Sequence, residues 1–382
     1  MAMTAKIPVE NRDPVESLKG FLRGLLEKAV VSALLVPQHL PMKKSVMPVL
    51  VTDPEKLDGA DPMAPAFPLN AARVLSRLSR KTSGIMMAAV LRPCELRAFI
   101  ELVKLKQGST DEVLLISMDC LGAFSNTDYG RFASDYEGHQ STLDFHRKIP
   151  ETDGPSWNGL SISPACKSCE YPVTDGADIT IGLLGNDIRE SMSIIANTER
   201  GEKALKALQF PEAEVPENRQ REIEDLIGKR TAYRDRMFEE TGAAVSDIDK
   251  LMSYLGNCVN CYNCRVACPV CYCRECVFTT DVFDHEPAQY FRWAKRKGII
   301  KMPTDTVFYH LTRMAHMSTA CIGCGQCSNA CPNGVPVMEL FRTIAHATQS
   351  GFSYTPGMSL EDDPPLSVFR EREFSEVTGG KD

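Results

Sequence analysis

Short apolar runs recur through the first 210 residues, and each is bounded by turn or polar residues. Runs of this length that lack polar interruptions are typical of buried strands. They lie at residues 85–91, 113–117, 179–184 and 194–196. Apolar residues at helical spacing occur at 17–30, 71–79 and 95–106. This alternation favours a sheet covered by helices, so residues 1–210 are predicted to form an α/β domain.

The pattern changes after residue 210. Two prolines and two acidic residues crowd residues 210–216, and a charged, helix-forming stretch follows from Glu217 to Glu240. We therefore expect a helical linker at 211–249, solvated or bridging two domains. A cysteine-rich domain is expected at 250–345. Residues 346–382 are polar and predict a loosely ordered tail or an arm that wraps a partner.

Composition and charge exclude several classes of protein. The chain has 382 residues and a net charge of -7, with no basic stretch that could follow a phosphate backbone, so no nucleic-acid partner is expected. The apolar run from Ala29 to Pro37 is too short to cross a bilayer. The first residues are too polar for a signal peptide, and a cytoplasmic protein without a membrane span is expected.

Cysteine content adds the first indication of chemistry. The chain has 15 cysteines, and eleven of them lie between Cys258 and Cys331. In a cytoplasmic chain of this size, such crowding indicates metal binding rather than disulfides.

Two segments repeat one cysteine pattern, C-x-x-C-x-x-C-x-x-x-C-P, starting at Cys258 and Cys321. This is the bacterial ferredoxin pattern, in which the fourth cysteine binds the other [4Fe–4S] cluster. One predicted cluster takes Cys258, Cys261, Cys264 and Cys331. The other takes Cys321, Cys324, Cys327 and Cys268. Zinc ribbons lack a third cysteine at the same step, and no C-x-x-C is followed by the His that haem attachment requires.

The spacing between the two motifs is long for a compact ferredoxin. The 52 residues from Pro269 to Ala320 predict a helical insertion in an α+β, bacterial-ferredoxin-like dicluster domain. The insertion begins with three surplus cysteines, and three interpretations compete. They could hold a further cluster with one non-cysteine ligand, such as His310 or His316; they could replace an assigned ligand; or they could be bystanders. These cysteines are Cys271, Cys273 and Cys276.

Four cysteines remain, namely Cys94, Cys120, Cys166 and Cys169. Cys94 follows the strand expected at 85–91, and Cys120 follows the strand expected at 113–117. In a parallel sheet both positions lie at the carboxyl edge, where doubly wound folds bind ligands. Cys166 and Cys169 form a compact pair in a loop. Four thiols converging there would bind one [4Fe–4S] cluster; scattered core cysteines are the alternative.

Residues 66–205 resemble the beta subunit family of deazaflavin (coenzyme F-420) hydrogenases and formate dehydrogenases. The resemblance rests on segments 89–98, 114–120, 166–182 and 192–201. It implies that Cys94, Cys120, Cys166 and Cys169 ligate a [4Fe–4S] cluster beside an FAD. Some members of the family also carry a C-terminal extension with two clusters. Three clusters are thus expected, or four if the surplus cysteines bind one.

The same resemblance implies flavin contacts, for which the candidates are Asn70, Arg92, Glu95, Gly182, Asn186 and Thr198. For Arg92 and Glu95, a helix-capping or surface pair is the alternative. The family usually has a Gly-Gly-x-x-Thr segment near its N-terminus, where this chain has Gly20 and Gly24 without the pair or the Thr. That departure favours a second hypothesis, a pure relay subunit with clusters but no flavin or substrate site.

No nucleotide-binding or hydrolase motif is present, so redox work remains. The expected function is that of an iron–sulfur flavoprotein subunit of a redox complex. It would pass electrons between a formate dehydrogenase or hydrogenase partner and a low-potential carrier through FAD and the clusters. The carrier would be deazaflavin, ferredoxin or a heterodisulfide-reductase-like partner.

Overall fold

The computed structural model describes residues 3–41, 45–149, 157, 159–273, 275–283, 285–298 and 305–368. Its first part contains a seven-stranded sheet of order β1-β7-β6-β5-β4-β2-β3. The strands are β1 (Thr4–Pro8), β2 (Ala33–His39), β3 (Val46–Val51), β4 (Met87–Leu91), β5 (Val113–Met118), β6 (Ile179–Gly182) and β7 (Ser191–Ala196). The central strands β2, β4, β5 and β6 are parallel, whereas β1, β7 and β3 pair antiparallel at the two sides.

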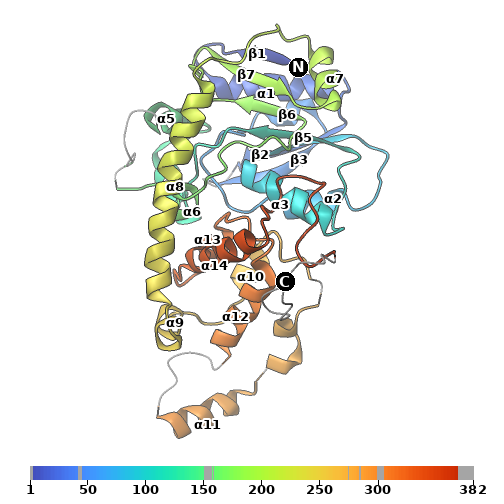
Figure 1. Cartoon of the computed structure of the whole chain (residues 1–382). Coiled ribbons are helices and arrows are strands. Elements are labelled where there is room, and N and C mark those ends of the chain that lie inside the picture. Colours follow the sequence, from blue (N-terminus) through green and yellow to red (C-terminus); the bar gives the residue numbers. More distant parts are fainter. Residues whose placement is uncertain are drawn as a thin grey trace, which may run out of the picture.

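Alternate residues of each strand face opposite layers of helices. Ala89 and Leu115 pack on the side covered by α2 (Ala72–Leu78) and α3 (Pro93–Lys104). Val90 and Leu114 pack on the other side, against α1 (Pro14–Glu27) and α7 (Glu199–Leu208). Figure 1 shows this arrangement. The predicted α/β domain is therefore present, with a mixed sheet.

The four strands and three helices expected from the sequence in residues 1–210 all form, within a few residues of their predicted bounds. The strands β1, β2 and β3 were not predicted. β2 and β3 pair with Pro37 opposite Pro48, and a proline inside a run of this kind argues against a strand when the sequence is read alone. Their pairing relies on neighbours in the sheet rather than on a local pattern.

Shorter elements lie in the connections between strands of the sheet. They are η1 (Pro54–Leu57), α4 (Asn126–Phe132), η2 (Ala133–Asp135), α5 (Gln140–Lys148) and α6 (Pro164–Lys167). The long helix α8 (Arg219–Ala244) then runs along one side of the molecule, from the sheet to the region that follows it (Figure 1). It packs against α6 and α14. The expected charged linker helix is present and bridges the two parts.

The cysteine-rich region consists of helices and loops. Its helical elements are α9 (Ile248–Tyr254), α10 (Asn263–Ala267), η4 (Val277–Thr279), η5 (Asp281–Phe283), α11 (Pro287–Lys297), α12 (Thr306–Met317), α13 (Gln326–Asn329) and α14 (Val337–Gly351). No strand occurs among its described residues, so the α+β prediction is wrong here. The segments that flank the cysteine motifs are the helices α9 and α14, which leaves no extended chain to pair.

The two parts share one core. Tyr309, Leu340 and Phe341 of the cysteine-rich region belong to the same buried cluster as Leu96 and Phe99 of α3. Such a continuous apolar contact fixes the cysteine-rich region on one face of the sheet.

Residues just after α14 are also docked, unlike the loose tail expected from 346 onward. Arg97 of α3 donates two hydrogen bonds to the carbonyl of Pro356, and Tyr354 donates to Glu101. The expected tail from 369 to 382 lies outside the described residues. Within the part of the chain that is described, no helix is both long and apolar enough to cross a membrane.

Candidate metal centres

The four scattered cysteines of the first part meet at the carboxyl edge of the sheet. Cys94 lies in the first turn of α3, directly after β4, and Cys120 follows the neighbouring parallel strand β5. Cys166 lies in α6, and Cys169 follows that helix. All four line one pocket together with apolar side chains such as Phe67 and Ile322. We call Cys94, Cys120, Cys166 and Cys169 the sheet-edge thiol group.

The electrostatics of this group suit a cationic occupant. Burial, reinforced by the neighbouring Glu95, raises the pKa of Cys94 well above its ordinary value. Burial, followed by the charge of Cys166, raises the pKa of Cys120 to about 11. Buried thiolates are therefore costly by themselves, and an iron–sulfur cluster, which binds thiolates, would offset that cost. The backbone N–H of Ala123 already donates to the sulfur of Cys166 at 3.3 Å.

The first ferredoxin motif gathers a second group. Cys258, Cys261, Cys264 and Cys331 line one small pocket with Tyr309 and His310 of α12. Cys261 is exposed, whereas Cys264 is buried. We call these four cysteines the outer thiol group. Its membership matches the crossed assignment expected from the sequence, because Cys331 comes from the second motif.

The remaining four ferredoxin cysteines form a third group, named here the inner thiol group: Cys268, Cys321, Cys324 and Cys327. After burial, the largest influence that raises the pKa of both Cys324 and Cys327 is the charge of Cys268. Backbone N–H groups of Gly323 and Gln326 point at the sulfurs of Cys321 and Cys324. Donors of this kind are what the sulfurs of an iron–sulfur cluster accept from.

The three thiol groups adjoin one another in a fixed order. Cys324 of the inner group lines the pocket of the sheet-edge group, and its charge acts on Cys94. Arg313 lies between the inner and outer groups, because Cys268 of the inner group and Cys264 of the outer group both raise the pKa of its guanidinium. The inner group is thus the link between the sheet edge and the exposed Cys261.

The surplus cysteines Cys271, Cys273 and Cys276 line neither the pocket of the sheet-edge group nor that of the outer group. Cys271 lies near the inner group, because the charge of Cys268 acts on it. Cys273 is exposed. His310 contacts Cys258 instead of the surplus cysteines, with its Nε2 3.4 Å from the sulfur. Across the described residues, no three Cys, His, Asp or Glu side chains are arranged to hold a single metal ion.

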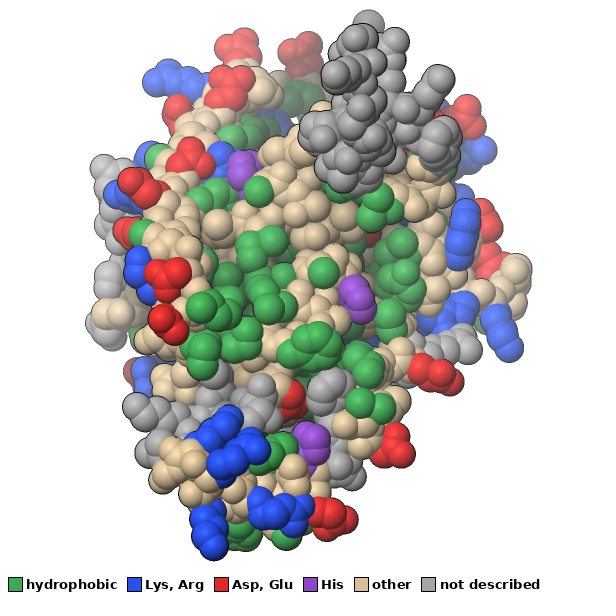
Figure 2. Space-filling view, turned by 60° about the horizontal axis from the view of Figure 1, so that its bottom comes forward, with side chains coloured by type: hydrophobic (Ala, Val, Ile, Leu, Met, Phe, Trp, Pro, Cys, Tyr) green, Lys and Arg blue, Asp and Glu red, His purple; other side chains and the backbone are tan. Residues whose placement is uncertain are grey.

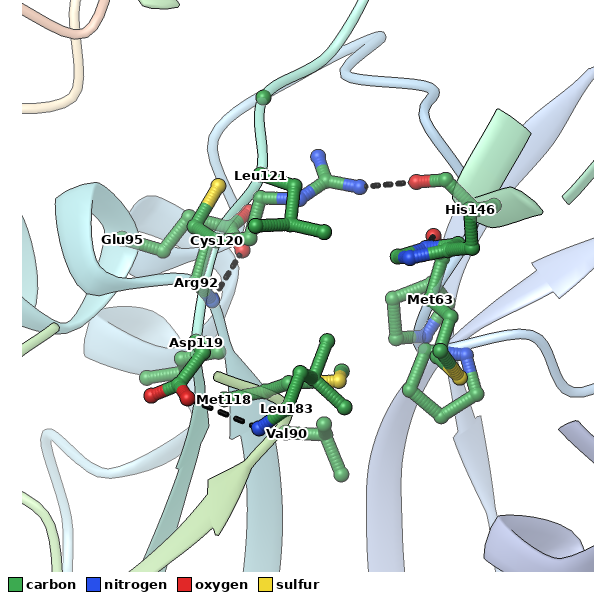
Figure 3. Close-up of a pocket in the computed structure, with 15 residues that line it drawn as sticks. Met63, Val90, Arg92, Glu95, Met118, Asp119, Cys120, Leu121, His146 and Leu183 are labelled. Atoms are coloured by element: carbon green, nitrogen blue, oxygen red, sulfur yellow. Dashed lines mark hydrogen bonds between the residues drawn. The ribbon is translucent and has the colours of Figure 1, made fainter. Parts of the chain in front are cut away.

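A further pocket lies directly beside Cys120 at the same sheet edge (Figure 3). Arg92 and Glu95 border it on one side and His146 on the other, with Leu121 and Leu183 between them. We call it the edge pocket. Glu95 accepts hydrogen bonds from the backbone N–H groups of Arg92 and Ala71, and Arg92 donates to the carbonyl of Ala64.

The edge pocket opens into a larger depression, the outer cavity, with which it shares Leu121, His146 and Leu183. The outer cavity encloses about 2100 Å³ of empty space, including its open mouth. Cationic side chains, among them Arg12, Arg147 and Lys229, line it together with leucines and isoleucines. The carboxylates of Asp187, Glu222 and Asp225 line it as well, so the cavity offers charges of both signs beside its apolar side chains.

Family comparisons agree with this division of the chain. Residues 86–215 match the C-terminal part of the coenzyme F420 hydrogenase/dehydrogenase beta subunit family, and residues 254–335 match a 4Fe-4S dicluster domain. The chain is an oxidoreductase subunit of this beta-subunit type.

Two curated relatives cover nearly the whole chain. The F420-dependent formate dehydrogenase subunit beta of Methanocaldococcus jannaschii is 24% identical over 93% of this chain and 94% of its own length. The F420-dependent formate dehydrogenase 1 subunit beta of Methanococcus maripaludis is 25% identical over 94% and 96%. A chain of the F420-reducing [NiFe] hydrogenase complex from Methanosarcina barkeri aligns with a TM-score of 0.47 and 14% identity, covering 65% of this chain and 94% of that one.

The predicted flavin contacts of this beta-subunit-type chain divide into two sets. Arg92 and Glu95 line the edge pocket, and Asn186 lines the outer cavity. Arg92 and Glu95 also cap α3, so the capping role that the sequence offered as an alternative is present as well.

The other three candidates lie elsewhere. Asn70 accepts a hydrogen bond from the backbone N–H of Ala72, the first residue of α2, and its side chain reaches Cys324, so it faces the inner thiol group. Gly182 packs against Arg219. Thr198 caps α7 and donates to Asp178, beside the start of β6 and thus at the sheet edge opposite the pockets. Thr198 lies at that opposite edge because β7 runs antiparallel and ends there.

Sequence reasoning missed the residues that complete the edge pocket. Met63 and Pro62 come from the loop after η1, and His146 comes from α5. No local pattern marks them, because their role arises only when these segments pack around the strand ends. Among them, the Nδ1 atom of His146 is buried without a hydrogen-bond partner among the described residues.

Proposed function

We propose that this chain is an iron–sulfur flavoprotein subunit of a redox complex. It would pass electrons between a formate dehydrogenase or hydrogenase partner and a low-potential carrier. The carrier would be deazaflavin, a ferredoxin or a heterodisulfide-reductase-like partner. The observation that carries the proposal is the series of three adjoining thiol groups that begins beside the edge pocket. The names of the two curated relatives support the formate and deazaflavin parts.

Each thiol group would hold one [4Fe–4S] cluster, which exchanges single electrons. The donor sets fit, since each contains four thiols, and the pockets of the sheet-edge and outer groups are lined largely by apolar side chains. The protein supplies backbone donors to the sulfurs and low solvent access, and both tune the potential of a bound cluster. The Arg92 and Arg230 guanidiniums near Cys120 would offset part of the negative charge of the sheet-edge cluster.

The edge pocket and outer cavity would hold FAD. This cofactor exchanges a hydride with a two-electron carrier and single electrons with clusters. The residues present fit it in two ways. Arg12, Arg147 and Lys229 of the outer cavity offer charge to a diphosphate. The buried, unpartnered Nδ1 of His146 offers an acceptor to a ring N–H at the boundary of the two pockets.

The opposite end of the series would face the partner. Cys261 of the outer thiol group is exposed, and so are the apolar side chains of Val259 and Val266 beside it, at 57% and 59%. Figure 2 shows apolar side chains gathered over the face that carries the cysteine-rich region. Apolar surface of this kind next to an electron-transfer centre favours contact with another protein.

A pure relay subunit without flavin is the alternative. Its support is the segment around Gly20 and Gly24, which lacks the family's Gly-Gly pair and forms the middle of α1, packed on the sheet through Leu18 and Leu22. A helix packed in this way offers no glycine loop to a flavin.

Anaerobic isolation of the full chain, with iron, zinc and flavin measured on one sample, tests the proposal. We expect about twelve irons per chain, four for each cluster, and FAD released by acid. Twelve irons without flavin would favour the relay alternative, and zinc without iron would refute both. Oxidation of reduced deazaflavin by the chain, with a viologen as electron acceptor, then tests the carrier. If the flavin-loaded protein does not oxidise reduced deazaflavin, deazaflavin is removed from the proposal.

A further inference from the structure

The insertion between the two ferredoxin motifs contributes one helix to the thiol groups. Four polar side chains of α12 are buried, and three of them, Tyr309, His310 and Arg313, lie beside the cysteines and are 0%, 1% and 4% exposed. Tyr309 and Arg313 are four residues apart and therefore lie on the same helix face. Buried polar groups at three places on one helix are costly unless each has a partner.

All three side chains find partners in the outer thiol group. Arg313 donates from Nη1 to the sulfur of Cys264 at 3.0 Å and from Nη2 to its carbonyl at 3.3 Å. The hydroxyl of Tyr309 lies 3.3 Å from the same sulfur. The Nε2 atom of His310 lies 3.4 Å from the sulfur of Cys258.

Arg313 has no carboxylate counter-charge among the described residues. Its guanidinium lies over the ring of Phe341, with 4.7 Å to the ring centre, and reaches toward the inner thiol group through Cys268 and Cys327. Burial alone would lower the pKa of Arg313, but the charges of Cys264, Tyr309, Cys268 and Cys327 raise it. Thiolates are thus the groups that this buried cation faces.

The inner thiol group receives a different environment. Its sulfurs accept from backbone N–H groups, such as those of Gly323 and Gln326, and from the side chain of Asn70. The charges of Arg342, Arg313 and Arg97 also act on Cys321, but none of these arginines is hydrogen-bonded to an inner-group sulfur among the described residues. Only the outer group has a direct cation–sulfur hydrogen bond, together with two further side-chain contacts from α12, among the described residues.

We propose that α12 raises the reduction potential of the outer cluster above that of the inner cluster, with Arg313 as the main positioning residue. The inference rests on the proposed function, because it requires both clusters. Reduction adds one electron to a cluster, and a nearby cation or hydrogen-bond donor stabilises the added negative charge. One electron leaves the inner cluster, which is oxidised, and enters the outer cluster, which is reduced; no proton moves and no bond changes.

This difference would give the series a direction. Electrons that arrive from the sheet edge would collect at the outer cluster, next to the exposed Cys261. The exposed end would then be the reservoir from which a partner is supplied. A partner that donates electrons at this end would need a potential below that of the outer cluster.

Redox titration of the full, anaerobically reconstituted chain, followed by electron paramagnetic resonance, tests the proposal. Each cluster gives one reduction wave in the titration. The wave that changes in Cys261→Ser is that of the outer cluster, because this variant alters one of that cluster's ligands. In Arg313→Gln, we expect this wave to fall relative to that of the inner cluster. The expected change in the equilibrium between the clusters is about tenfold or more, which is about 59 mV for one electron.

Two further variants separate charge from shape. Arg313→Lys keeps the charge and should restore part of the shift, whereas Tyr309→Phe removes one donor and should lower the outer wave by less than Arg313→Gln. Arg292→Gln on α11 is the matched control, because Arg292 is exposed and its guanidinium donates to Gln289, away from the thiol groups. It should move neither wave.

The outcomes distinguish this inference from the proposed function. Full iron content with unshifted waves in Arg313→Gln overturns the role of α12 and leaves the function intact. If Arg313→Gln does not fold, an unchanged outer wave in Tyr309→Phe overturns it equally, because that variant removes a donor to the sulfur of Cys264. A wild-type chain without two ferredoxin-type waves refutes the proposed function itself.

Discussion

Arg219, the first residue of α8, donates two hydrogen bonds to the carboxylate of Asp119, which directly precedes Cys120; the Nη2–Oδ1 distance is 2.8 Å. Asp119 also accepts from the backbone N–H groups of Leu183 and Leu184, at 2.8 and 3.0 Å. One buried carboxylate thus joins β5, the loop after β6 and the long helix. It holds the wall of the edge pocket to the helix that reaches the ferredoxin region.

The Asp119→Asn variant should lose stability strongly. Removing the carboxylate charge leaves the Arg219 guanidinium buried without its partner, which typically costs about 3–5 kcal/mol. Asp58→Asn is the control, since Asp58 is 85% exposed in its pair with Arg23 and such pairs contribute less than about 1 kcal/mol. Anaerobic urea denaturation followed by circular dichroism measures both. Equal stability of the two variants would contradict this account of Asp119.

The second ferredoxin motif depends on a glycine that touches the sheet-edge group. Gly325 has φ +78°, and a Cβ there would lie 2.4 Å from the Cβ of Ala165, next to Cys166. Gly334 has φ +64° but no atom within 4 Å of such a Cβ. Gly334→Ala should therefore cost only the backbone strain, roughly 1–2 kcal/mol. Gly325→Ala should add about 1–3 kcal/mol of overpacking.

Thermal unfolding and retained iron compare the two glycine variants. We expect Gly325→Ala to unfold at the lower temperature and to lose iron first, because Ala165 belongs to the pocket of the sheet-edge group. Similar losses in both variants would mean that the approach of the two segments does not matter for stability.

The sequence predicted those parts of the site whose signals are local. The spacing of Cys258, Cys261 and Cys264 marks a cluster loop directly, and Cys94 and Cys120 follow recognisable buried strands. His146 and Arg313 carry no such mark. Each lies on an ordinary amphipathic helix, and its role depends on which distant segment packs against that helix. The helical flanks of the ferredoxin motifs were missed for the same reason, since the motif fixes the loop and not its surroundings.

Substituting the surplus cysteines should leave the iron content unchanged. Cys271, Cys273 and Cys276 line neither thiol pocket, so Cys273→Ser and the triple Ser variant should both retain about twelve irons per chain. Cys166→Ser, in contrast, should lose about four irons because it removes a sheet-edge thiol. Iron analysis after anaerobic reconstitution makes the comparison. A wild-type content near sixteen irons that falls to twelve in the triple variant would assign the surplus thiols to a fourth cluster.

The stability of the chain should depend on pH through His146. Burial lowers the pKa of His146 from its ordinary 6.5, and the hydrogen bond to the carbonyl of Met63 and the charge of Asp61 only partly oppose this shift. Below pH 6.5 the unfolded chain therefore binds a proton that the folded chain does not. The contribution of neutral His146 is present above that pH and is lost as the pH falls, by at most about 1.4 kcal/mol per pH unit.

His146→Gln isolates this contribution, because an amide stays neutral and can still donate to the Met63 carbonyl. Anaerobic unfolding from pH 7.5 down to 5.5 should show wild type losing stability more steeply than the variant, so that the difference between them shifts in favour of the variant. Other groups titrate equally in both proteins and cancel in that difference. Parallel curves would mean that His146 is protonated in the folded chain, and it would then offer no acceptor to a ligand in the edge pocket.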